Sequence, residues 1–296
     1  MTVCALGMGI ALEEPRVDGL AEVVEVLAQW QDDAGPMQLH PGDVGWFWRN
    51  GSEATAAAIR TWRLGGRPVA VGLLDGPTVL RLAIAPDALR DTDLAHRLAE
   101  DADDPGRGVL PDGKVCVESP NGSLVPEVLT GRGWATGEPW TQLHRDLAQP
   151  VESGARIEVV GPQQAGIRSA VHRASFDGST FGDENWRQMA AGPPYAQARC
   201  LVARDEDGAP VAAATVWSSG PGRPGVIEPL GAHRDHRGRG HGREITIAAA
   251  ATLRQLGCSS ARVATPSSNV AAVAAYLSAG FRVLGENLDR VREPTG

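Results

Sequence analysis

The sequence predicts an α/β (α+β) protein built from two related domains, residues 1–150 and 151–296. The first observation is length, because 296 residues exceed one typical domain and suit two of about 150 residues each. The second is a strand, a glycine-rich turn and a helix that follow one another without a break from Val226 to Gly257. The third is an internal repeat.

The repeat consists of two pairs of similar segments at nearly equal offsets. Aligning Asp87 with Asp235 gives 148 residues (235 − 87), and aligning Gly133 with Gly280 gives 147 (280 − 133). Equal offsets over separate segments are typical of a duplicated unit. Residues 147–155 have the proline and polar content of a linker, so the two units are expected to join there.

The turn after Val226 has the composition of a phosphate-binding loop. Glycines let backbone approach a ligand, the first turn of a helix leaves N–H groups unpaired, and the helix dipole favours negative charge there. Neither the P-loop nor the dinucleotide-binding pattern fits, since the glycines are spaced G-x-G-x-G and no Lys-Ser or Lys-Thr pair follows them. The pattern present is R-x-x-G-x-G, at Arg237, Gly240 and Gly242.

A second motif follows at a fixed distance. After the helix pattern ends at Gly257, a short run over 261–265 predicts a strand. The next helix pattern reads N-x-x-A-x-x-x-Y-x-x-x-G-F, from Asn269 through Tyr276 to Phe281. The two motifs together resemble the acyl-CoA pyrophosphate loop and the last helix of the GNAT superfamily of N-acetyltransferases.

That resemblance implies the fold, the co-substrate and the reaction. Each half would be a GNAT-like domain, with a mixed, strongly twisted central sheet flanked by helices. The co-substrate would be acetyl-CoA, without a metal, and its acetyl group would pass by direct attack to an amine, with Glu228 as base and Tyr276 as acid. The residues implied to bind acetyl-CoA are Leu230, Gly231, Ala232, Arg237, Gly238, Arg239, Gly240, His241, Gly242, Arg243 and Asn269.

Both catalytic candidates have a simpler interpretation. Glu228 is also what a solvated carboxylate at a strand end looks like. Tyr276 is also what an aromatic core residue looks like on a helix of alanine, valine and leucine. The catalytic interpretation of Tyr276 is favoured because its spacing from Asn269 directs both side chains toward the same end of the co-substrate.

The first half lacks the side chains that form the two motifs in the second half. Leu89, Thr92 and Leu94 occupy its loop positions, and Leu129 stands where the tyrosine would be. Asp91 in this turn would repel a pyrophosphate. The first half is therefore expected to be a degenerate copy without an acyl-CoA site, in a tandem architecture similar to that of mycothiol synthase.

The amine acceptor is expected to be small and cationic. In the superfamily its pocket is lined by the first helices and their loop, which here contains Phe176, Asp177, Phe181 and Trp186. Carboxylates and aromatic rings bind cations. The same segment also fits a surface loop anchored by aromatic residues, so both interpretations stay open.

Composition narrows the partners. A net charge of −8 argues against nucleic-acid binding, and no apolar run reaches the length of a membrane span. The start of the chain lacks a basic segment, so we expect a cytoplasmic protein, monomeric or homodimeric. His233, His236 and His241 match no standard zinc spacing. A non-catalytic acyl-CoA-binding or regulatory module is the alternative to an enzyme.

Overall fold

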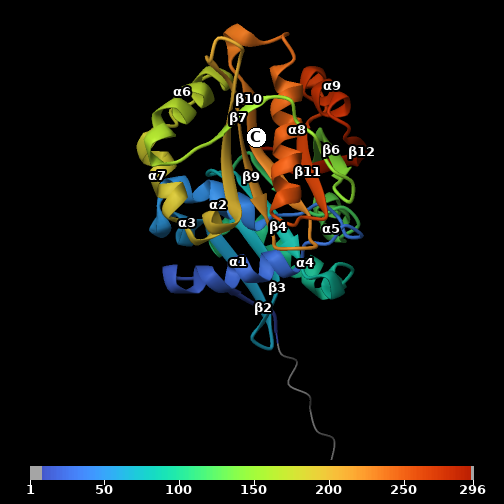
Figure 1. The fold of residues 1–296 in the computed structure, drawn as a ribbon. Helices are drawn as coiled ribbons and strands as arrows, with labels where there is room; N and C mark the ends of the chain where they lie inside the picture. Colours follow the sequence, from blue (N-terminus) through green and yellow to red (C-terminus); the bar gives the residue numbers. More distant parts are fainter. Residues whose placement is uncertain (1–8, 295–296) are drawn as a thin grey trace, which may run out of the picture.

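The computed structural model of the chain describes residues 9–294. Its strands form one 12-stranded sheet in the order β1-β2-β3-β4-β5-β12-β6-β11-β10-β9-β8-β7 (Figure 1). The strands are β1 (Ala11–Glu13), β2 (Ile59–Leu64), β3 (Arg67–Leu74), β4 (Val79–Ile84), β5 (Val115–Glu118), β6 (Ala135–Asp146), β7 (Arg156–Val159), β8 (Ala198–Arg204), β9 (Pro210–Ser218), β10 (Gly225–Ala232), β11 (Ser260–Pro266) and β12 (Arg282–Arg292).

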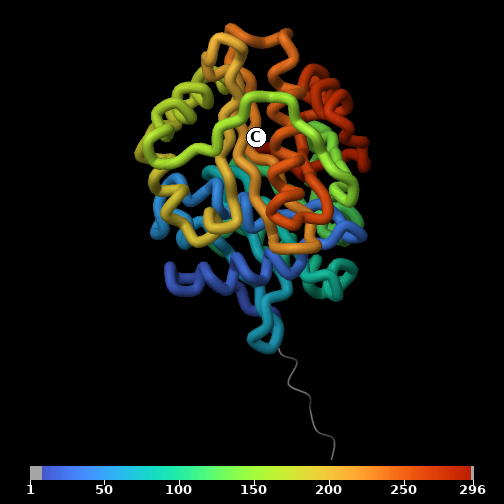
Figure 2. The backbone as a smooth tube through the Cα atoms, viewed as in Figure 1, coloured from blue at the N-terminus to red at the C-terminus, as the bar shows by residue number. Residues whose placement is uncertain are grey.

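Helices lie on both faces of this sheet. The α-helices are α1 (Leu20–Gln29), α2 (Pro41–Phe47), α3 (Ser52–Ala58), α4 (Thr92–Asp103), α5 (Val125–Gly131), α6 (Ala165–Ser175), α7 (Asp183–Ala191), α8 (His241–Gln255) and α9 (Val270–Ser278). The short 3-10 helices are η1 (Val17–Gly19), η2 (Trp48–Asn50), η3 (Pro86–Ala88), η4 (Pro105–Arg107), η5 (Pro162–Gln164), η6 (Pro193–Gln197) and η7 (Arg234–His236). In Figure 2 the blue and cyan part of the first half lies below the orange and red part of the second half.

The sheet is built from two equivalent sets of six strands, in which β1 to β6 of the first half correspond to β7 to β12 of the second. With this correspondence, the strand order is the same when it is read from either edge of the sheet. The corresponding strands β6 and β12 begin 147 residues apart (282 − 135). The two halves are therefore structural repeats, as the sequence repeat predicts. The predicted fold class, two GNAT-like units in tandem, is confirmed.

The halves exchange their last strands. β6 pairs antiparallel with β11 of the second half, whereas β12 pairs antiparallel with β5 of the first. β6 and β12 also pair with each other, so the sheet is continuous across the junction. The boundary between residues 150 and 151 stays a prediction, and the loop at 147–155 joins units that share strands.

Alternating side chains give each half two cores, one on each face of the sheet. In the second half, Ala214 and Val216 of β9 pack under α8, while Trp217 packs toward α6 and α7 on the other face. In the first half, Val71 and Leu73 of β3 likewise pack under α1. The opposite face packs under α4 and α5.

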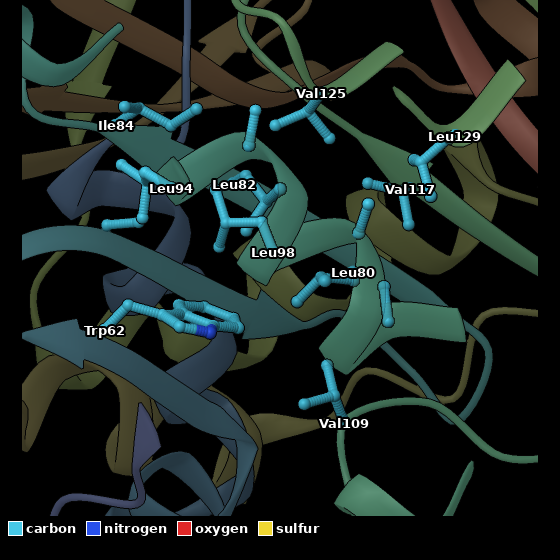
Figure 3. Packing of buried hydrophobic residues seen from close by; sticks show 14 of the residues in the cluster. Trp62, Leu80, Leu82, Ile84, Leu94, Leu98, Val109, Val117, Val125 and Leu129 are labelled. Atoms are coloured by element: carbon cyan, nitrogen blue, oxygen red, sulfur yellow. The ribbon is translucent and has the colours of Figure 1, made fainter. Parts of the chain in front are cut away.

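The core beneath α4 and α5 is filled with large apolar side chains. Figure 3 shows Leu94 and Leu98 of α4 and Leu129 of α5 packed over the side chains of β4 and β5. All three leucines are at most 2% exposed. This is the region where the second half carries Tyr276, so the first half has a closed apolar core at the matching place.

Helix α2 of the first half packs directly on the second half. A Cβ added to Gly42 would lie 2.5 Å from two side-chain atoms of Trp217, so only glycine permits this approach. The Trp217 indole N–H donates a 2.7 Å hydrogen bond to the Glu228 backbone carbonyl. Contacts from the first half thereby help to position the strand that carries Glu228.

Candidate active site

A cavity of about 600 Å³ lies where the two halves meet. One wall is the strand β10 from Ile227 to Leu230, and another is β11 from Val263 to Pro266. Within residues 9–294, β10 and β11 pair in parallel at Gly225↔Ala261 and Val226↔Arg262 only, and the two strands separate after Val226. The gap between them opens into the cavity.

Glu228 lies on β10 at the centre of this wall. The register between β10 and β9 shifts between Ile227 and Leu230, so the strand bulges at Glu228 and Pro229. Bulges redirect side chains, and the Glu228 carboxylate faces the cavity, with 36% of the side chain exposed.

The pKa of Glu228 is raised to about 8. The main cause is partial removal of the carboxylate from water, and the nearby carboxylates of Asp43 and Asp75 add to the effect. A carboxylate with this pKa suits general base catalysis.

Arg81 of β4 crosses from the first half to this carboxylate. Its guanidinium lies 2.9 Å from Glu118, 3.1 Å from Asp43 and 3.5 Å from Asp75, and 4.0 Å from Glu228. The positive charge of Arg81 opposes the rise in the pKa of Glu228. The electrostatic environment of Glu228 is therefore set largely by the first half.

Tyr276 of α9 also lines the cavity, and only 6% of the residue is exposed. Its burial, and then the nearby charge of Glu228, raise the pKa of the phenol. The hydroxyl therefore stays protonated at neutral pH. Because the same cavity holds a carboxylate and a phenol, it contains a proton acceptor and a proton donor.

The glycine turn lies between β10 and α8. Gly238 and Gly240 have φ angles of 76° and 90°, which side chains other than glycine rarely adopt. A Cβ added at either position would meet nothing within 4 Å, so this backbone borders open space. α8 begins directly after Gly240 without a side-chain cap, and its first N–H groups are free of side-chain acceptors among the described residues. The loop fits a pyrophosphate group.

In the first half, the N-terminus of the matching helix α4 is blocked by a side chain. Asp91 is the N-cap of α4, and its carboxylate accepts a 2.8 Å hydrogen bond from the Leu94 backbone N–H. This carboxylate occupies the position that an anion would need and adds a like charge. The comparison of α4 with α8 supports the expectation that only the second half can bind a pyrophosphate.

The loop and the helices around it match a family model. Residues 170–281 match the model of the acetyltransferase (GNAT) family. The matched residues lie within the second half, which is therefore similar to a GNAT domain over this segment. No curated protein matches the sequence.

Solved structures extend the likeness to the fold of the whole chain. A GCN5-related N-acetyltransferase from Sphaerobacter thermophilus is 16% identical, with a TM-score of 0.60 over 96% of this chain and 95% of that one. A GNAT acetyltransferase from Colwellia psychrerythraea is 14% identical, with a TM-score of 0.61 over 95% and 98% of the two chains. A tandem GNAT protein from the clavulanic acid biosynthesis pathway is 18% identical, with a TM-score of 0.59 over 97% and 100%. At these identities the likeness is one of fold.

The uncharged residues expected to bind acetyl-CoA lie along β10 and at the starts of α8 and α9. Leu230 lines the cavity, and Asn269 lines it while capping α9 with a 3.2 Å hydrogen bond from the Ala272 N–H. A Cβ on Gly231 would lie 2.5 Å from that of Ser175, so close packing against α6 also requires this glycine. Ala232 leads from the cavity wall toward the loop, and Gly242 lies in the first turn of α8.

Two of the three arginines at the loop form hydrogen bonds with backbone carbonyls of other segments. Arg237, Arg239 and Arg243 are exposed. Arg237 donates a 2.8 Å hydrogen bond to the Ser175 carbonyl, and Arg243 donates one of 3.0 Å to the Ser278 carbonyl. The His241 ring lies 3.2 Å from the Glu244 carboxylate. Their role toward acetyl-CoA stays a prediction.

The residues predicted for the acceptor are only partly brought to the cavity. Phe176 lines it. Asp177 instead lies 3.1 Å from Arg234, and 83% of its side chain is exposed. Phe181 and Trp186 are buried in the core with α6 and α7, at 5% and 3% exposure. These two rings anchor the segment, which is the simpler interpretation weighed above.

Sequence reasoning missed the contribution of the first half. Asp75, Arg81, Cys116 and Glu118 line the cavity of the GNAT domain, as does Asp289 on the exchanged strand β12. Each acid looks like an ordinary surface residue in the sequence. Only the strand exchange brings them together.

The remaining features add no further site. Among residues 9–294, no group of three or more His, Cys, Asp or Glu side chains is placed to hold a metal ion. The helices described there are too short or too polar to cross a bilayer. Cys4 lies outside the described residues, and Cys116, Cys200 and Cys258 are free thiols.

Proposed function

We propose that the chain is an N-acetyltransferase that transfers the acetyl group of acetyl-CoA to an amine of a small, cationic acceptor. The observation that carries this proposal is the single cavity in which Glu228 and Tyr276 face the gap between β10 and β11. The open glycine loop lies at the end of the same strand. This arrangement supplies a base and an acid in one cavity, and an anion site at the end of the strand that forms its wall.

The residues of the chain divide the reaction between them. The loop at Gly238 and Gly240 and the N-terminus of α8 bind the pyrophosphate through backbone N–H groups. Asn269 lines the cavity. Leu230 to Ala232 present backbone groups on a strand that has separated from β11, with Ala232 as the donor to the acetyl carbonyl. Acetyl-CoA, when bound, supplies an activated acetyl thioester.

Proton transfer is assigned to the two catalytic candidates. Glu228 accepts the proton that the amine loses as its nitrogen forms the new bond to the acetyl carbon. Tyr276 donates a proton to the sulfur as the carbon–sulfur bond breaks. The raised pKa of each group favours its role, since Glu228 becomes a stronger base and Tyr276 keeps its proton until the thiolate forms.

The charge of the cavity supports a cationic acceptor. Asp75, Glu118, Glu228 and Asp289 line it, against the single guanidinium of Arg81. A positively charged molecule is attracted to such a surface and stabilised within it. Asp177 does not contribute to this charge, because its side chain pairs with Arg234 and does not line the cavity.

A panel of amines, assayed for free-thiol release from acetyl-CoA, tests the proposal. Polyamines, amino sugars and amino-acid derivatives are the first compounds to include. We expect thiol release that depends on the amine and an acetylated amine detected by mass spectrometry. Acetyl-CoA binding without turnover for every amine would favour a non-catalytic acyl-CoA-binding module instead.

A further inference from the structure

The cavity holds more negative charge than its catalytic chemistry requires. One base suffices for amine attack, and Glu228 fills that role in the proposed function. Glu118 and Asp289 are further carboxylates on the wall formed by β5 and β12. Arg81 binds one of them, Glu118, at 2.9 Å, whereas Asp289 has no arginine or lysine partner within the described part of the chain.

The two carboxylates are placed side by side by the strand exchange. β5 and β12 pair with Arg290 opposite Val117 and Val291 opposite Cys116. Continuing this antiparallel register by one residue places Asp289 opposite Glu118. Like charges at facing positions of a sheet destabilise it. Burial, and then the charge of Glu118, raise the pKa of Asp289 to about 6.

Asp289 lines the cavity opposite an irregularity in the neighbouring strand. The register between β12 and β6 shifts between Leu288 and Arg290, and the additional residue of this bulge lies on β6. The Asp289 carboxylate accepts a weak 3.4 Å hydrogen bond from the Asn287 side-chain N–H, and the Cys116 thiol lies 3.6 Å from it. Arg81 and Arg290 oppose the rise in the pKa of Asp289 from a distance, but neither forms an ion pair with its carboxylate within residues 9–294.

Asn287 gives a second, independent indication of a ligand. This residue is only 6% exposed, and it lines the cavity. Its side-chain N–H donates to Asp289, which directs its carbonyl oxygen away from that carboxylate. No donor to this oxygen is found within residues 9–294. This oxygen is therefore free to accept a hydrogen bond from an N–H group of a ligand in the cavity.

We propose that the acceptor carries two positively charged nitrogens, and that Asp289, Glu118 and Asn287 bind the second one while the reacting amine faces Glu228. The substrate class is then a diamine, a polyamine or a di-amino sugar rather than a monoamine. The inference rests on the proposed function, whose reaction it leaves unchanged. Specificity would come from the first half and from the exchanged strand, whereas catalysis comes from the GNAT domain.

Matched pairs of amines test this inference directly. Putrescine and butylamine have the same carbon chain and differ by one ammonium group, as do cadaverine and pentylamine. We expect each diamine to have the lower KM, by roughly tenfold or more, which is the scale of one charge-assisted hydrogen bond. Asp289→Asn keeps the shape of the side chain and should raise the KM of the diamines to that of the monoamines, with kcat nearly unchanged.

The control is Glu293→Gln, which removes one negative charge outside the cavity, where Glu293 pairs with Lys114 at 3.0 Å. This variant should keep the preference for diamines. Equal KM values for diamines and monoamines in the parent chain would overturn the inference and leave the proposed function intact. So would a diamine preference that survives in Asp289→Asn.

Calorimetry keeps the two proposals distinguishable. Putrescine should bind to the protein without acetyl-CoA more tightly than butylamine, and Asp289→Asn should abolish that difference. This result would support the binding site even if no amine were acetylated, in which case only the proposed function would fail. Equal binding of the two amines would contradict the inference whatever the activity.

Discussion

Tyr276 is one of only two tyrosines in the chain, which gives its predicted role a matched control. Tyr276→Phe removes the proton donor and keeps the ring in the core. We expect kcat to fall by about 10²–10⁴-fold if thiolate departure limits turnover, with acetyl-CoA affinity nearly unchanged. Steady-state kinetics and calorimetry measure the two quantities.

Tyr195→Phe is the control, because Tyr195 packs against Trp186 and Trp217 and does not line the cavity. It should keep full kcat. Full activity in Tyr276→Phe as well would reduce Tyr276 to a packing residue.

The raised pKa of Glu228 predicts an alkaline activity profile. Glu228 must lose its proton to act as base, so below its pKa the active fraction grows about tenfold per pH unit. For a given acceptor, kcat/KM should therefore rise with pH and level off above about pH 8. In Glu228→Gln the rate should fall, and the rise that remains should follow the acceptor's own ionisation alone. An unchanged profile in that variant would remove Glu228 from the mechanism.

At the scale of elements, the contrast between α8 and α4 predicts where acetyl-CoA binds. Gly240→Asp forces a side chain into a φ of 90° and places a carboxylate at the N-terminus of α8. We expect a severe loss of acetyl-CoA affinity, measured by calorimetry. Gly66→Asp is the control, since Gly66 has a φ of 82° and open space around it in the β2–β3 turn. Equal losses in both variants would mean that general destabilisation, not the loop, is responsible.

Local patterns predicted the second half well. The helix expected between Gly242 and Gly257 is α8, and Asn269 begins α9 as its N-cap. Such features depend on neighbouring residues, which the sequence displays directly. Phe181 and Trp186 were harder to interpret, because an aromatic residue beside acids fits both a ligand site and a core anchor.

At the scale of the molecule, the sequence could not reveal how the halves share strands. The repeat predicts two similar units, but the apolar pattern of β6 does not say whether it pairs with β5 or with β11. The pairing decides that Glu118 and Asp289 become neighbours. The acceptor wall of the cavity was therefore invisible until the sheet was known.

The shared strands predict that the halves do not fold separately. Residues 151–296 alone lack β6, which lies between β11 and β12, so both strands would expose unpaired edges. We expect this fragment to be unfolded or aggregated by circular dichroism and size-exclusion chromatography. Adding residues 1–150 should restore a folded complex. A soluble, folded fragment that binds acetyl-CoA with full affinity would contradict this expectation.

The central claim is that one acyl-CoA site remains, in the second half, and that the first half has closed its own. Calorimetric titration of the full chain with acetyl-CoA tests it most directly. We expect one molecule bound per chain, and no binding of comparable affinity in Gly240→Asp. Two equivalent sites per chain, or one site that persists unchanged in Gly240→Asp, would contradict the claim.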